Sequence, residues 1–156
     1  MNHFKSKGSC PEDGENANQG DGQACWNPAR VESASLLSDW VKQMQLDQRE
    51  AHALILGDLN SYRMEDPIRV LVREGWVDVA GQFLDPPLYS YRYRGELGTL
   101  DYAFASGDLI RRVDDADIWH INADAAPDGP DSQTGISRFS DHDPVVVDIK
   151  LLDNSR

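Results

Sequence analysis

The chain has 156 residues, 40% of them hydrophobic and 8% aromatic, which is enough for one folded domain with its own core. Its formal net charge is −12. That charge counts against a passive nucleic-acid-binding module, which needs a basic face to neutralise phosphates. It counts less against a metallo-hydrolase, because the metal ligands of such an enzyme are themselves carboxylates.

The first third of the chain predicts a strand end, a long loop and a helix. Residues 2–7 are typical of the end of a strand, and residues 8–27 are polar and glycine-rich without periodicity, which favours a loop. Residues 28–46 have apolar side chains at helical spacing after Pro28 and predict an amphipathic helix. Its apolar residues are Val31, Leu36, Leu37, Trp40, Val41 and Met44. Arg30, at the start of this helix, is open to two interpretations, a phosphate contact or a solvated side chain.

The middle of the chain predicts a buried strand and a second helix. Residues 53–56 (ALIL) form a short continuous apolar run, which is typical of a strand covered on both faces. A helix is expected to begin at Asp66 and Pro67 and to end near Glu74. Residues 76–79 favour a short strand or a turn.

The last third predicts three more strands. Residues 100–105 (LDYAFA) alternate, residues 115–121 favour a further strand, and residues 144–151 (PVVVDIKL) give the clearest strand pattern of all. Residues 122–138 are rich in Pro, Gly and Asp and predict a loop. Because strands outnumber helices and the helices fall between strands, we expect an α/β or α+β fold with a sheet covered by helices on one face.

Two cysteines, Cys10 and Cys25, flank the long polar loop. In an exported protein they would form a disulfide that closes a loop of about 15 residues and stabilises the fold by roughly 3 kcal/mol. In a cytosolic protein they would be two free thiols. No secretory leader and no transmembrane run is visible in the sequence.

Two short motifs place chemistry at strand ends. Gly57-Asp58-Leu59-Asn60 follows the buried strand, so its carboxylate and amide can hold a hard cation and a phosphate oxygen. Ser140-Asp141-His142-Asp143-Pro144 precedes the last strand and sets a histidine, which titrates near neutral pH, between carboxylates. The structural alternative is the same for both motifs, because Asp and Asn are also favoured in turns that serve no catalytic purpose.

Two single residues complete the set of candidates. Asp101 lies in an apolar strand, where a carboxylate is costly unless it is paired; it either orients a histidine or points to solvent. His3 stands near the beginning of the chain, and a lone histidine in such a place usually has no function.

Taken together, a strand followed by GDLN, then LDY in a strand, then SDHDP before a final strand resembles the endonuclease/exonuclease/phosphatase superfamily. This group includes DNase I-like nucleases, apurinic-site endonucleases, sphingomyelinases and inositol phosphatases. The segments NHFKSKGS and QACWNPAR, with the helix after them, resemble most closely the secreted bacterial nucleases of the group. The resemblance extends from His3 to about Leu151.

The resemblance implies a role for each candidate. His3 matches the histidine that contacts the scissile phosphate, and Asp58 and Asn60 match the Asp-x-Asn pair that orients phosphate and nucleophile near the metal. Asp101 matches the carboxylate that holds the second histidine, and His142 matches that histidine, which acts as general base or stabilises the transition state. These catalytic candidates are joined by one metal-side carboxylate, Asp141.

The resemblance also implies the setting of the reaction. The cofactor would be a divalent cation, Mg²⁺ or else Ca²⁺ or Mn²⁺, and the substrate nucleic acid, with DNA preferred. The location would be extracellular or periplasmic, with Cys10 and Cys25 joined as a disulfide and without membrane association. Two alternatives remain: an enzyme of the same superfamily that acts on a lipid or sugar phosphate, and an inactive fragment.

The family fold is a four-layered α/β/β/α sandwich of two similar halves with the active site between them. By this resemblance residues 1–151 form the C-terminal half, incomplete as a sandwich, and residues 152–156 form a tail. The family's early Asn and its metal-binding Glu lie in the first half and find no match here. We therefore expect the exposed inner face of a sheet, and as partner either a missing N-terminal half or a second copy of the chain.

Overall fold

A computed structural model of the chain describes residues 1–125 and 138–150. Three α-helices occur in this part of the chain: α1 (Asn27–Gln48), α2 (Asp66–Arg73) and α3 (Val79–Phe83). They are accompanied by a 3₁₀ turn at Ile110–Arg112. The strands are β1 (Asn2–His3), β2 (Leu54–Asp58), β3 (Val77–Asp78), β4 (Tyr91–Tyr93), β5 (Glu96–Gly98), β6 (Asp101–Ala105), β7 (Val113–Ile118) and β8 (Val145–Ile149).

The expected α/β character is confirmed, and most predicted elements occur within a few residues of their expected bounds. The prediction missed α3 and the β4–β5 hairpin. Most of the predicted loop 122–138, the end of the last predicted strand at Leu151 and the tail 152–156 lie outside the described residues.

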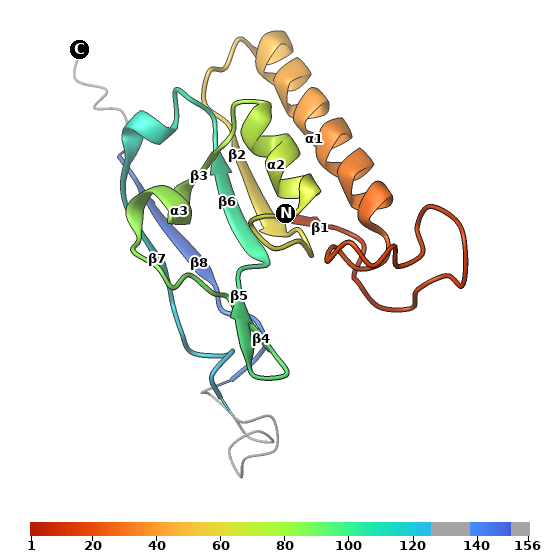
Figure 1. Cartoon of the computed structure of the whole chain (residues 1–156). Helices are drawn as coiled ribbons and strands as arrows, with labels where there is room; N and C mark the ends of the chain where they lie inside the picture. Colours follow the sequence, from red (N-terminus) through yellow and green to blue (C-terminus); the bar gives the residue numbers. More distant parts are fainter. Residues whose placement is uncertain (126–137, 151–156) are drawn as a thin grey trace, which may run out of the picture.

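The central sheet has the strand order β1-β2-β6-β3. β1 runs parallel to β2, whereas β6 is antiparallel to both β2 and β3. A second sheet consists of β7 and β8, and the β4–β5 hairpin forms a third. Figure 1 shows α1 and α2 on one side of β2 and β6, β7 and β8 on the other, and the hairpin beyond the start of β6.

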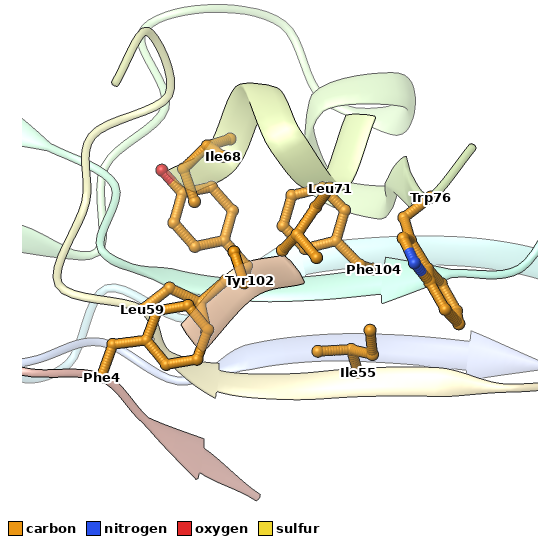
Figure 2. Close-up of a cluster of buried hydrophobic side chains, with 9 residues drawn as sticks. Phe4, Ile55, Leu59, Ile68, Leu71, Trp76, Tyr102 and Phe104 are labelled. Atoms are coloured by element: carbon orange, nitrogen blue, oxygen red, sulfur yellow. The ribbon is translucent and has the colours of Figure 1, made fainter. Parts of the chain in front are cut away.

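Each face of the central sheet buries its own apolar layer. On the helix side, Ile68 and Leu71 of α2 point toward Tyr102 and Phe104 of β6 (Figure 2). The other members of this layer are Phe4, Ala34, Ile55, Leu59 and Trp76. The opposite layer joins alternate residues of β6 to the β7–β8 sheet and contains Val79, Ala103, Ala105, Leu109, Val113 and Ala116. The fold therefore has three layers, which are the helices, the central sheet and the β7–β8 sheet, so that the central sheet is covered on both faces.

The face of the central sheet toward β7 and β8 is open at one end. Leu56 of β2, on the same face as Leu54, is 38% exposed. Between β2 and β8 lies a cleft of about 440 Å³, whose lining includes Met1, Leu56 and Val145. Apolar side chains thus border a solvent-filled cleft where the sequence predicts an uncovered inner face.

Helix α1 follows the sequence expectation only in part. Of its predicted apolar residues, Leu37 and Val41 pack against the helix-side core, whereas Leu36, Trp40 and Met44 are 62%, 62% and 41% exposed. The fully buried positions of the helix carry Arg30, Ala34 and Ser38. Helical spacing predicted the helix correctly, but it did not identify the small and polar residues at the centre of its buried face.

Arg30 is neither a solvated side chain nor a surface phosphate contact, because it is fully buried. Its guanidinium donates hydrogen bonds to the backbone carbonyls of Lys5, Gln23 and Cys25 at 2.9–3.3 Å. It therefore joins α1 to both ends of the long loop, and a buried cation in such a position is stabilised by the carbonyl dipoles that surround it.

The same loop is closed by a disulfide between Cys10 and Cys25, whose Cα atoms are 5.5 Å apart. The predicted pairing of the two cysteines is therefore present in the structure. None of the helices in the described part of the chain has the length and apolar character that a membrane span requires.

Asp143 fixes the segment before β8 to the end of β7. Its carboxylate is 1% exposed, accepts hydrogen bonds from the backbone amides of Asn122 and Ala123, and pairs with His120 Nδ1 at 2.8 Å. Burial acts to raise the pKa of Asp143, but the hydrogen bonds from His120, Ala123 and Asn122 outweigh it and hold that pKa below its ordinary value.

We predict that Asp143→Asn lowers the free energy of unfolding at neutral pH by about 1.5–3 kcal/mol, the usual effect of losing hydrogen bonds to a charged group. Because the folded-state pKa of Asp143 is depressed, its contribution is present above the ordinary Asp pKa and is lost as the pH falls through the lowered value. Urea unfolding of both proteins at pH 7 and near pH 3 measures this, and the stability difference should shrink in acid. A difference that is independent of pH would contradict the assignment.

Candidate active site

The site begins with the register of two strands. In the antiparallel pair β2–β6, Asp58 lies directly opposite Asp101. Both side chains point to the face that also carries Leu54 and Ala103, and both are about one-fifth exposed (20% and 19%). Like charges opposite each other on a sheet are unfavourable, so this pair needs compensation from its surroundings.

The GDLN segment turns the chain so that its side chains face different partners. A Cβ on Gly57, at φ +146°, would meet the Asn2 carbonyl oxygen at 1.9 Å, so only glycine allows β1 to pair here. Leu59 is fully buried in the core, and Asn60 adopts a left-handed backbone with φ 47°. Its side-chain amide donates to Asp58 and to the Phe4 carbonyl, both at 3.1 Å. The turn therefore holds the Asp58 carboxylate while linking it to β1.

Asp101 is held by two partners through one oxygen. Its Oδ2 accepts a hydrogen bond from Ser90 Oγ at 2.7 Å and lies 2.7 Å from His142 Nδ1. Ser90 Oγ in turn accepts the backbone amides of Leu100 and Asp101. A histidine whose Nδ1 faces a carboxylate presents Nε2 to the solvent side, and the neutral ring then has its lone pair on Nε2.

The imidazole of His142 is therefore set up to take a proton. Its hydrogen bond with Asp101 raises the pKa of His142 above the ordinary value, although partial burial of the ring acts in the opposite direction. The charges of Asp101, Asp58 and Asp141 add to the increase. For Asp58 the order of causes differs: burial raises the pKa of its carboxyl most, and the neighbouring Asp101 raises it further.

Asp58, Asp101 and His142 offer ligand atoms that all lie within 4.8 Å of one another. Asp101 Oδ2 is occupied by Ser90 and His142, whereas the Asp58 oxygens accept bonds only from Asn60 among the described residues. A hard divalent cation in proteins usually takes one or two carboxylates and keeps several waters. The residues therefore fit such a cation, with Asp58 as its main protein ligand, since a nearby positive charge would offset the cost of burying two carboxylates.

His3 lies at the edge of this group. Its Nε2 is 3.5 Å from Asp58 Oδ2, and its side chain is 73% exposed, so it borders the open cleft between β2 and β8. Asp141 is exposed and does not belong to the ligand group, although it is near enough for its charge to act on His142 and Tyr91. The structure thus brings five of the six candidates, His3, Asp58, Asn60, Asp101 and His142, into one site and leaves Asp141 at its margin.

Two residues of the site, Ser90 and Tyr91, were missed by the sequence reasoning. Ser90 orders Asp101, and Tyr91 forms a backbone bridge with His142 and packs against its ring at 4.6 Å between centroids. Asp143 was recognised in the SDHDP motif, but its role as the anchor of this segment was not predicted. Ser90 and Tyr91 lie more than 40 residues before His142, so nothing local connects them. The available signal was the alternation YSYRYR at residues 89–94, which favours a strand whose rings share a face.

Comparison with known proteins agrees with this geometry. A family model described as Endonuclease/Exonuclease/phosphatase family matches residues 8–142, which is most of the chain and includes GDLN, LDY and the SDH motif. A search among curated proteins finds no match.

We predict that in the metal-free protein His142 titrates above the ordinary histidine pKa and that Asp101→Asn lowers this midpoint, because the largest cause of the increase is removed while burial remains. The measurement is an NMR pH titration of the histidine rings in EDTA. The chain has four histidines, and loss of one resonance in His142→Gln assigns the signal.

Asp114→Asn is the matched control for this titration, because Asp114 is exposed and pairs with Lys150 at the far end of the β7–β8 sheet. It should leave the midpoint of His142 in place. An unchanged midpoint in Asp101→Asn would show that the hydrogen bond does not set the charge state of His142.

Proposed function

Because the chain belongs to the endonuclease/exonuclease/phosphatase family, whose members hydrolyse phosphate esters, we propose that it is a metal-dependent phosphodiesterase that cleaves DNA outside the cell. One observation carries the proposal: the Asp101–His142 pair stands beside Asp58 where β2 ends and β6 begins, and among the described residues Nε2 of the 23% exposed His142 ring has no hydrogen-bond partner. A base and a cation-binding carboxylate side by side are what hydrolysis of an unactivated phosphodiester requires.

In the proposed reaction, water attacks the phosphorus in line with the leaving oxygen. His142 Nε2 accepts the proton of that water, or in its protonated form donates a hydrogen bond to the developing charge on phosphate. Asp101 keeps the ring in the required orientation and stabilises its positive charge through the 2.7 Å contact. His3 borders the same space and is suited to hold a phosphate oxygen, whereas the Asn60 amide, which donates to Asp58 and to the Phe4 carbonyl, holds the Asp58 carboxylate in place.

A divalent cation, when bound, supplies electrostatic stabilisation of the pentacovalent state. Asp58 is the residue suited to hold it, with Asp141 near enough to contribute through water, as magnesium sites commonly do. The disulfide supports the extracellular part of the proposal, because such bonds persist in oxidising compartments and are rare in the cytosol.

We predict that His142→Ala abolishes nicking of supercoiled plasmid in the presence of Mg²⁺ while leaving the fold intact, with a loss of roughly 10²–10⁴-fold, the usual contribution of one general acid–base group. Circular dichroism and the melting temperature check the fold. His52→Ala is the matched control, since His52 pairs with Glu50 away from the site and its replacement should leave the rate unchanged. Near-normal nicking by His142→Ala would refute the catalytic role.

Bis(4-nitrophenyl) phosphate is the second substrate of this experiment. If this small diester is cleaved but plasmid is not nicked, the activity is hydrolysis of a small phosphate ester and not DNA cleavage. If neither substrate is cleaved, the proposed phosphodiesterase activity is contradicted.

A separate prediction concerns the cation. Asp58→Asn should weaken Mn²⁺ binding, measured by electron paramagnetic resonance in the absence of substrate. The affinity for Mn²⁺ should fall by at least roughly 10- to 100-fold, which is the usual effect of removing a residue that only supports a metal ligand. Asp114→Asn, exposed and remote, should bind as the parent protein does. Equal affinity in Asp58→Asn and the parent protein would exclude Asp58 as the main ligand.

A further inference from the structure

A row of aromatic rings leads away from the catalytic histidine. The ring of Tyr91 lies 4.6 Å from that of His142, and Tyr91 and Tyr93 are 6.4 Å apart between centroids with an angle of 18° between their planes. Both tyrosines lie on the same face of β4, since alternate residues of a strand share a face. The guanidinium of Arg94 ends the row, 5.2 Å from the centroid of Tyr93.

A fourth ring lies beside this row. Tyr91 is paired in the hairpin with Gly98, and the space that a Cβ on Gly98 would occupy is filled by the ring of Tyr62, 2.4 Å away. The ammonium of Lys7 lies 3.9 Å above the ring of Tyr62 and is paired with Glu65. Gly98 therefore serves to seat an additional tyrosine next to Tyr91.

The outer part of the row is open to solvent. Tyr93 is 50% exposed, and Arg94 is exposed with no carboxylate within ion-pair distance in the part of the chain that the structure describes. Arg92 points to the other face of the strand and pairs with Asp124 at 2.6 Å, which fixes the hairpin against the loop after β7. An exposed tyrosine beside a free guanidinium thus stands on a supported hairpin in a chain whose net charge is −12.

We infer that the ring row of Tyr91, Tyr93 and Arg94, defined here as the hairpin platform, binds single-stranded nucleic acid by stacking unpaired bases next to the scissile phosphate. This rests on the proposed function and specifies its substrate. Every base has a π-face, so a row of tyrosines binds bases without regard to sequence, and Arg94 adds a contact to phosphate or base. In a duplex the faces of the bases are stacked on each other, so the platform favours unpaired strands.

The hairpin platform also explains how a chain of net negative charge could bind a polyanion. Binding of a polyanion through phosphates alone needs many basic side chains. Stacking gains affinity from ring surface instead, and it requires few positive charges. The position next to His142 then places the phosphate that follows a stacked nucleotide near the Asp101–His142 pair.

The test is fluorescence anisotropy with a labelled dodecamer of deoxythymidine in EDTA, which prevents cleavage. Tyr93→Ala and Tyr93→Leu should raise the Kd roughly 5- to 100-fold, the effect of losing one base–aromatic stack. Tyr93→Phe, which keeps the ring, should bind within about twofold of the parent protein. Tyr93→Leu keeps apolar bulk, and melting temperatures verify that each variant is folded. Trp40→Ala is the matched control, because Trp40 is a 62% exposed ring on the outer side of α1, and it should bind normally.

A dodecamer of the same charge that lacks bases separates stacking from phosphate binding. The parent protein should bind it about as weakly as Tyr93→Ala binds the thymidine dodecamer, and a 12-base-pair duplex should bind more weakly than the single strand. Equal affinity for the dodecamers with and without bases, or an unchanged Kd in Tyr93→Ala and Tyr93→Leu, would overturn the inference. Because binding is measured without turnover, that result is distinct from failure of the proposed function, which cleavage of bis(4-nitrophenyl) phosphate reports separately.

Discussion

The arrangement of the site depends on one register, the one that sets Asp58 opposite Asp101 in neighbouring antiparallel strands. Two carboxylates so placed repel each other and favour slippage of the strands. A shift by one residue would turn every side chain of the strand to the other face. The carboxylate of β6 would then enter the helix-side core, and the large rings of Tyr102 and Phe104 would have to fit where Ala103 and Ala105 pack against the β7–β8 sheet. The apolar layers on the two faces of the sheet therefore keep the carboxylates together.

The polar surroundings of the pair complete this compensation. Asn60 donates to Asp58, Ser90 and His142 contact Asp101, and the cleft leaves room for a cation. Each partner comes from a different segment, so the repulsion between the carboxylates is offset only in the folded chain. The sheet thus holds two carboxylates and a histidine together at the ends of two strands, partly open to solvent, which is the arrangement that the proposed function needs for a cation and a base.

The sequence predicted the parts of the site that are local and not those that are assembled. GDLN and SDH are informative because turn residues next to an apolar strand place polar groups at a sheet edge, and Asp101 is conspicuous in an apolar strand. Ser90, Tyr91 and the pairing of His120 with Asp143 depend on contacts between distant segments. The packing of α1 was predicted only in part for the same reason. Leu37 and Val41 pack against the core as expected, but the buried Ser38 and Arg30 depend on the distant Trp76 indole and on loop carbonyls.

The net charge can now be related to the geometry. The formal net charge of the chain is −12, and a polyanion is repelled by such a charge over a Debye length of about 8 Å at physiological ionic strength. Short-range forces must then select the productive approach, and rings act at short range. The tyrosines lie along β4 from His142 outward, with Arg94 at the exposed end, so attraction would be strongest where the repulsion has to be overcome. A phosphodiesterase of the proposed kind would gain discrimination in this way, because a strand without accessible bases would meet the repulsion and not the rings.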